Sequence, residues 1–100
     1  MKPIIENLNK SFENRVRLGM MSVLMVNEVI DYLELKELLQ VTDGNLASHA
    51  AALEKAGYIK VNKDFVGKKT RTSYTATRLG VKAFQNHLKA LEELIKKNAG

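Results

Sequence analysis

Hydrophobic residues recur at helical spacing along several stretches of this chain. Within residues 11–26 they fall at i, i+4, i+8, i+11 and i+12, which predicts a first helix with one buried face. Leu35 to Gln40 repeats this pattern over a shorter length and predicts a compact second helix with its three leucines turned inward. Residues 27–33 contain β-forming side chains and are compatible with either a loop or one short strand.

The stretch from Thr42 to Gly57 has the clearest start and stop signals. The hydroxyl of Thr42 can accept a hydrogen bond from an unpaired N–H of the first helical turn, and Gly57 suits a left-handed helix end. Leu46, Ala50 and Leu53 form one apolar face. The other face carries Asn45, Ser48, Ala52 and Lys55. A helix with so slim an outer face can enter a DNA major groove, and the short turn before it makes a helix-turn-helix over residues 35–57.

After Gly57 the pattern changes from helical to alternating. Residues 58–65 and 71–75 alternate between apolar and polar side chains, and residues 66–70 supply a glycine and exposed lysines. This predicts a β-hairpin over residues 58–76 with a basic tip. Two interpretations of the basic tip stay open. Its side chains either belong to a solvated loop and prevent edge-to-edge pairing of strands, or they lie along a phosphate backbone.

A long helix is predicted at the end of the chain, over residues 77–97, with Thr77 as its cap. Its apolar stripe contains Phe84, Leu88, Leu91 and Ile95. Their spacing alternates four and three, as in a coiled-coil seam, which predicts that part of the stripe meets a second copy of the chain. The lead-in at residues 4–8 could join that interface. The alternative is an ordinary amphipathic helix that packs on its own core.

Composition narrows the class of protein. One hundred residues, 45% of them hydrophobic and 27% charged, predict one soluble domain over residues 1–100. The chain has no cysteine, which excludes disulfides and thiolate chemistry and suits a reducing cytosol. The longest nearly apolar run, residues 18–26, is too short to cross a bilayer. We therefore expect a cytoplasmic protein that is not bound to membranes.

Positive charge is concentrated in one segment of the chain. The net charge is +5, and residues 60–82 hold seven basic side chains against Asp64 alone. Residues 1–59 hold six basic and eight acidic side chains. Such a single-signed cluster favours an anionic partner, with nucleic acid the usual one and an acidic membrane surface the rival.

The order of helix, helix-turn-helix, basic hairpin and long helix resembles the winged-helix transcriptional regulators. In particular it is similar to the small single-domain bacterial and archaeal regulators related to the MarR and ArsR families. The resemblance runs from Phe12 to Ile95. The residues that carry it are Leu35–Leu39, Thr42–Leu46, Ser48, His49, Leu53–Ile59, Phe65–Lys69, Tyr74–Thr77 and Gly80. It implies a mainly α fold with a small β-hairpin (α+β), a winged helix-turn-helix DNA-binding domain with a long C-terminal helix.

The resemblance also implies roles for particular residues. The helix Thr42–Lys55 would read the major groove of double-stranded DNA, and the wing Val66–Arg71 would grip the phosphate backbone. The expected DNA-binding residues are Thr42, Asn45, Ser48, His49, Lys55, Lys68, Lys69 and Arg71. The expected dimerisation residues, for a homodimer, are Phe84, Leu88, Leu91 and Ile95. Because the recognition helix is rich in alanine and has no arginine, only moderate base discrimination is expected.

The same residues bear on other possible functions. His49 either touches a phosphate or base, or bonds within the core at the edge of the apolar face. Its only companion is His87, far away in sequence, so neither a metal site nor a cofactor is expected. The sequence shows no phosphate-cradling glycine loop and no nucleophile–base pair, and therefore predicts no catalytic residues and no enzyme. The remaining alternative is a winged-helix module that binds another protein and not DNA.

Overall fold

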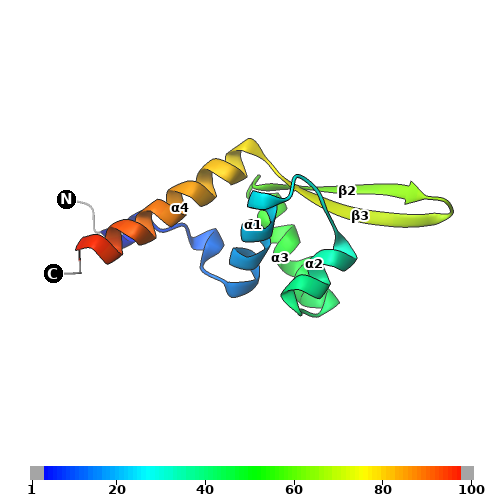
Figure 1. Ribbon diagram of the computed structural model, residues 1–100, viewed down its shortest axis with the longest axis horizontal. Coiled ribbons are helices and arrows are strands. Elements are labelled where there is room, and N and C mark those ends of the chain that lie inside the picture. Colours follow the sequence, from blue (N-terminus) through cyan, green and yellow to red (C-terminus); the bar gives the residue numbers. More distant parts are fainter. Residues whose placement is uncertain (1–3, 98–100) are drawn as a thin grey trace.

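The computed structural model describes residues 4–97, and it has an elongated shape. Its extents are 58 × 25 × 21 Å, and its radius of gyration is 15.3 Å, above the roughly 13 Å of a compact chain of this length. Figure 1 shows the cause: a long helix and a long hairpin project in opposite directions from a small helical body. The elements in order are η1 (Ile4–Asn7), η2 (Lys10–Phe12), α1 (Arg15–Val26), β1 (Ile30–Asp31), α2 (Tyr32–Leu39), α3 (Asp43–Lys55), β2 (Ile59–Val66), β3 (Lys69–Ala76) and α4 (Arg78–Lys97). The predicted fold class, mainly α with a β-hairpin, is confirmed.

The first long helix begins later than predicted. Residues 10–12 form a separate 3₁₀ turn, η2, and α1 begins only at Arg15. The reason is a second cap: the side-chain oxygen of Asn14 accepts hydrogen bonds from the backbone N–H groups of Val16 and Arg17 at 2.9 and 3.2 Å. An asparagine in extended conformation that captures these N–H groups starts a new helix. The hydrophobic spacing is continuous across residues 11–26 and therefore did not predict the break between η2 and α1.

The ambiguous stretch before α2 is a short strand followed at once by a helix start. Asp31 ends β1 and caps α2, because its carboxylate accepts from the N–H of Leu33 at 2.7 Å. The second helix therefore begins three residues earlier than predicted. The prediction that all its leucines face inward is wrong for Leu38, which is 62% exposed. Leu35 and Leu39 lie one turn apart on the buried side, and Leu38 lies on the flank of that stripe.

The strands form one antiparallel sheet in the order β1-β3-β2. The short strand β1 pairs only two residues with β3, Ile30 with Tyr74 and Asp31 with Ser73. Strands β2 and β3 pair along their whole length and are joined by a two-residue turn in which Gly67 has a φ of +65°. The hairpin is thus a two-stranded ribbon beyond Ser73, and this ribbon reaches one end of the molecule (Figure 1).

The core is built around α1. Met20, Met21 and Leu24 are buried against side chains from α2, α3, the sheet and α4. At the α4 side, Phe12 meets Phe84 edge to face with 5.2 Å between ring centroids. Helix α1 therefore links the elements that carry the predicted DNA-reading and dimerisation surfaces.

Candidate nucleic-acid interface

Helix α3 has the ends and faces that its sequence predicts. The hydroxyl of Thr42 accepts from the N–H of Asn45 at 3.2 Å, and Gly57 after the helix has a φ of +84°. The buried side of the helix consists of Leu46, Ala50 and Leu53. The side chains of Asn45, Ser48 and Lys55 are exposed. The helix therefore presents small and polar groups to solvent over its whole length.

The turn between α2 and α3 is fixed by a cluster around Asp43. The Tyr32 hydroxyl donates a hydrogen bond to the Asp43 carboxylate, and the Lys36 ammonium lies 2.9 Å from the same carboxylate. The hydrogen bond from Tyr32, followed by Lys36, lowers the pKa of Asp43, and the same bond raises the pKa of Tyr32 to about 12. Gln40, between the helices, has a left-handed φ of 52°. The start of α3 is thus tied to α2 by side chains as well as by the turn.

His49 faces the first helix. The Nε of Arg17 donates to the Nδ1 of His49 at 3.0 Å, and the imidazole is half-buried. Burial, followed by the neighbouring Arg17 charge, lowers the pKa of His49. A neutral imidazole that accepts from α1 supports the structural alternative for His49 over a phosphate contact.

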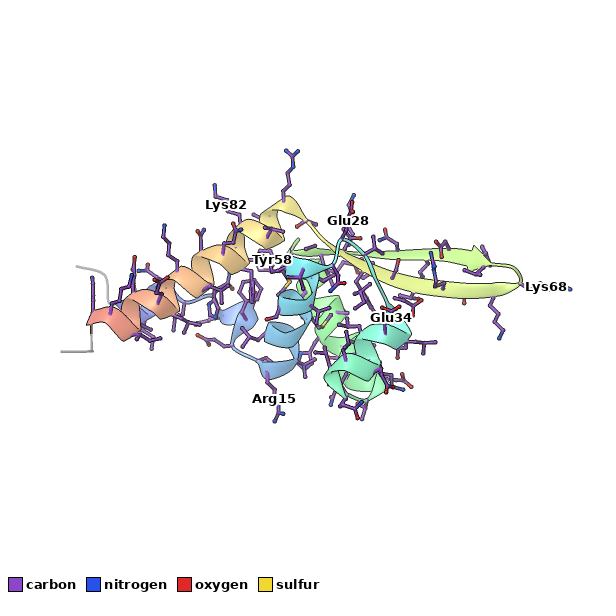
Figure 2. All side chains as sticks on the ribbon, viewed as in Figure 1. Arg15, Glu28, Glu34, Tyr58, Lys68 and Lys82 are labelled. Atoms are coloured by element: carbon purple, nitrogen blue, oxygen red, sulfur yellow. The ribbon has the colours of Figure 1, made fainter. Side chains whose placement is uncertain are left out.

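The three predicted wing cations differ in their surroundings. Arg71 is paired across the hairpin with Asp64, with Nη2–Oδ2 and Nε–Oδ1 distances of 3.2 and 3.3 Å. Lys68 lies in the turn, and Figure 2 shows it at the far end of the hairpin. Lys69 begins β3 beside it and is exposed. The lysines are therefore better placed than Arg71 to meet phosphates.

A hollow of about 320 Å³ separates α3 from the hairpin. It is lined on one side by Ala47, Ala51 and Glu54, and on the other by Val61, Lys63 and Thr72, among others. The strand register puts one set of hairpin side chains on this side, which we call the α3-facing side of the hairpin. Its members are Ile59, Val61, Lys63 and Phe65 from β2 and Thr70, Thr72, Tyr74 and Ala76 from β3.

Sequence reasoning missed two cations that border this surface. Lys63 lines the hollow beside α3, and its alternation with Val61 was the available signal. Arg15 lies at the start of α1 and lines a second hollow together with Thr42 and Asn45. Figure 2 shows the Arg15 side chain projecting away from the helical body. Nothing in its sequence neighbourhood linked Arg15 to α3, because the two helices meet only in the fold.

The stripe predicted for dimerisation divides into a buried and an exposed part. Phe84 is 2% exposed and belongs to the core, so it is not open to a second copy. Leu88, Leu91 and Ile95 are 44%, 36% and 70% exposed. The lead-in at residues 4–8 contains the short 3₁₀ helix η1, which packs on α4 of its own chain. The exposed leucines and isoleucine form the remaining apolar face of α4.

The described residues contain neither a metal-binding cluster nor a membrane-spanning helix. Within residues 4–97, no three His, Asp or Glu side chains lie close enough together to hold a metal ion. His87 is instead buried against Phe12, and its Nδ1 accepts from the backbone N–H of Asn9 at 2.9 Å. None of the helices in this range has both the length and the apolar character needed to span a membrane.

Comparison with known proteins agrees with this geometry. The family model described as a winged helix DNA-binding domain matches residues 16–95. The uncharacterized protein MJ0432 of Methanocaldococcus jannaschii is 32% identical over 87 residues, which cover 87% of this chain and 95% of that protein. The structure of a transcriptional regulator homologue from Pyrococcus horikoshii has a TM-score of 0.83 at 29% identity, covering 94% of this chain and 91% of that one. A MarR-family protein from Porphyromonas gingivalis, with a TM-score of 0.68 at 24% identity, covers 94% and 86% and shares the fold. The predicted resemblance and the winged helix-turn-helix fold are confirmed.

Proposed function

The chain belongs to the family of winged helix DNA-binding domains, and on this premise we propose that it is a homodimeric transcriptional regulator of moderate sequence specificity. In this proposal α3 enters the major groove and the hairpin, the wing, follows the phosphate backbone. The observation that carries it is the exposed, slim face of α3 between cations from two other elements, Arg15 on one side and Lys63 on the other. The similarity to a transcriptional regulator homologue from Pyrococcus horikoshii supports the same function.

Base readout is assigned to the N-terminal half of α3. Asn45 and Ser48 are exposed one turn apart, and an asparagine can form two hydrogen bonds with adenine. The capped first turn directs N–H groups outward, where they can hold a phosphate together with Arg15. Ala47 and Ala51 let the helix backbone approach the groove but add only methyl contacts. Specificity is therefore shared between a few side chains and the shape of the DNA.

Dimerisation is assigned to the exposed part of α4. Leu88, Leu91 and Ile95 form an apolar face that the described residues of one copy leave open to solvent. A second copy packed on this face would shield it from water, and a two-fold protein suits a two-fold operator. Phe84 is left out of this surface because it is buried within one copy.

DNA binding is tested with fragments selected from the source genome. We expect salt-dependent binding to the best fragment, and Asn45→Ala should weaken it by about 1–3 kcal/mol while changing the affinity for random DNA much less. Asn86→Ala is the matched control, since Asn86 is also exposed but lies on α4. Absence of any salt-dependent DNA binding would favour the alternative, a winged helix that binds another protein. Equal losses on selected and random DNA would show that Asn45 only positions the helix.

The dimer is tested by light scattering at micromolar concentration. The expected mass is twice the 11.2 kDa of the chain. Leu91→Glu should give the single-chain mass because it places a charge in the apolar face, whereas Gln85→Glu, a new charge at another exposed α4 position, should leave the dimer intact. A wild-type monomer that still binds DNA tightly would refute the dimer and leave the DNA-binding proposal standing.

A further inference from the structure

The far end of the wing carries an exposed aromatic side chain. Phe65 is 75% exposed, and it is the only aromatic among the exposed large hydrophobic side chains of the described residues. In the strand register it lies opposite Thr70, one pair before the pair that closes the turn. Its neighbour Val66 is also exposed, at 57%, but points to the other side of the hairpin. Neither side chain contributes to the core.

We propose that Phe65 is an apolar wedge that enters the minor groove of bound DNA, partly opens a base step and bends the duplex. This inference rests on the proposed function and adds to it a specific residue and a deformation of the DNA. Minor-groove proteins insert apolar side chains between base steps while basic residues beside them hold the phosphates. The wing has both components at its tip.

Position is the first argument. Phe65 lies on the α3-facing side of the hairpin, the side that borders the recognition helix at its inner end through Val61 and Lys63. The hairpin extends well beyond α3 to one end of the molecule, so its tip reaches DNA that α3 does not occupy (Figure 1). A minor groove about 6 Å wide cannot accept the whole ribbon, but it can accept a tight turn and one side chain.

Charge is the second argument, and it favours DNA over another copy of this chain. Lys68 lies in the turn and Lys69 directly follows it, and Lys63 is the charged residue on the side that holds Phe65. The acidic residue of the hairpin, Asp64, lies on the other side and is already paired with Arg71. An aromatic ring in these positive surroundings suits a polyanion, whereas a second wing would bring the same charge and repel it.

Energetics are the third argument. Removing a phenylalanine side chain from water contributes about 1.5–3 kcal/mol, which corresponds to at least a tenfold change in affinity. The cost of opening one base step offsets part of this gain, while the phosphate contacts that the lysines supply hold the duplex against the tip. Flexible pyrimidine–purine steps reduce that cost, and the wedge should therefore favour duplexes that contain them at the tip position.

The test measures affinity and bending of the full chain on end-labelled duplexes, with fluorescence energy transfer between the duplex ends as the bending signal. Probes are duplexes of random sequence and duplexes with or without TA and CA steps beyond the α3 site. Phe65→Ala should lower affinity about tenfold and reduce the bend, without changing the salt slope, since no phosphate contact is lost. Phe65→Leu should retain most of the affinity and bend because leucine also serves as a wedge.

Matched controls separate this effect from its alternatives. Val66→Ala removes an exposed apolar side chain from the opposite side of the hairpin and should change neither bend nor affinity. Lys68→Ala should flatten the salt slope by about one unit and keep the bend. Because Phe65 is exposed, its substitution should leave the free energy of unfolding unchanged.

Each outcome gives a definite answer. Loss of bend in Phe65→Ala, rescued by Phe65→Leu, would support the wedge. A wild-type protein that binds DNA while Phe65→Ala bends and binds it equally well would overturn the wedge but leave the proposed function intact. A change in dimer mass for Phe65→Ala would place the ring in a contact between copies and also overturn it. A wild-type protein with no DNA binding would overturn both.

Discussion

Replacing Gly80 with alanine should destabilise this protein strongly, because the first turn of α4 lies directly on the backbone of Tyr58. A Cβ atom at Gly80 would lie 2.0 Å from the Tyr58 carbonyl oxygen and 2.7 Å from its carbonyl carbon. Both atoms belong to the main chain and cannot rotate away as a side chain would. The helix would have to retreat by about 1 Å to reach even the closest contacts that real Cβ atoms make.

That retreat would break the bonds that anchor the start of α4. Thr77 donates from its backbone N–H to the Tyr58 carbonyl at 3.0 Å and from its hydroxyl to the Gly57 carbonyl at 2.6 Å. Each lost bond costs about 1 kcal/mol, and forcing extra volume into a packed contact costs about 1–3 kcal/mol. Since the two effects overlap, we expect Gly80→Ala to lower the free energy of unfolding by about 2–4 kcal/mol, out of a total of about 5–15 kcal/mol for a domain of this length.

Urea unfolding followed by circular dichroism measures this difference, at one fixed protein concentration because a dimer's stability depends on concentration. Gly44→Ala is the matched control: it lies within α3, and no described atom beyond its chain neighbours and the adjacent backbone of its own helix lies within 4 Å of the added methyl group. It should stabilise the protein by up to about 1 kcal/mol through helix propensity. A Gly80→Ala protein within about 0.5 kcal/mol of wild type would refute the reasoning, since backbone overlap of this size cannot be tolerated so cheaply.

Two further predictions concern charged groups. The double variant K68A/K69A should flatten the salt dependence of DNA binding by about two units, whereas Arg71→Ala should change it less because Arg71 is already paired on the hairpin; titrations over a range of salt concentrations compare them. Asp43→Asn should lower the pKa of Tyr32 from about 12 towards its ordinary 10.0, as measured by ultraviolet absorbance titration, and an unchanged value would contradict the hydrogen bond between them. The pKa of Asp43 is lowered in the folded state, so its contribution to stability is fully present above a pH of about 3.8, the ordinary pKa of the group. This contribution disappears as the pH falls through the lower pKa of the folded state. Asp43→Asn should therefore also flatten the fall of the free energy of unfolding at acid pH.

The sequence predicted most reliably the elements whose ends are marked by their own residues. Thr42 and Gly57 bracket α3, Thr77 caps α4, and the structure confirms all three. Starts set by a competing cap were misplaced, because Asn14 and Asp31 interrupt or extend patterns that hydrophobic spacing alone treats as continuous. Capping side chains thus set helix boundaries that hydrophobic periodicity does not predict.

The candidate site was predictable only where one element supplies it. The outer face of α3 and the basic tip follow from spacing within single segments. The burial of Phe84 could not be predicted from spacing, because a stripe of constant period looks the same whether its partner is the protein's own core or a second copy. Arg15 was missed because its closeness to α3 arises from packing between elements that lie far apart in sequence. Lys63 lies in the strand directly after α3, and its alternation with Val61 was a signal that the prediction did not use.

The uneven width of the sheet has a consequence for hydrogen exchange. Near its base β3 lies between two neighbours, but from Lys63 to the turn and back to Thr72 the ribbon has no third strand and its residues are exposed or half-buried. Isolated two-stranded ribbons are only marginally stable in water, so amide protons should exchange progressively faster from Tyr74 towards Gly67. A DNA duplex bound at the tip would slow the exchange most near Gly67, where exchange in the free protein is fastest. The gradient in exchange protection would then record how far along the ribbon the ligand reaches.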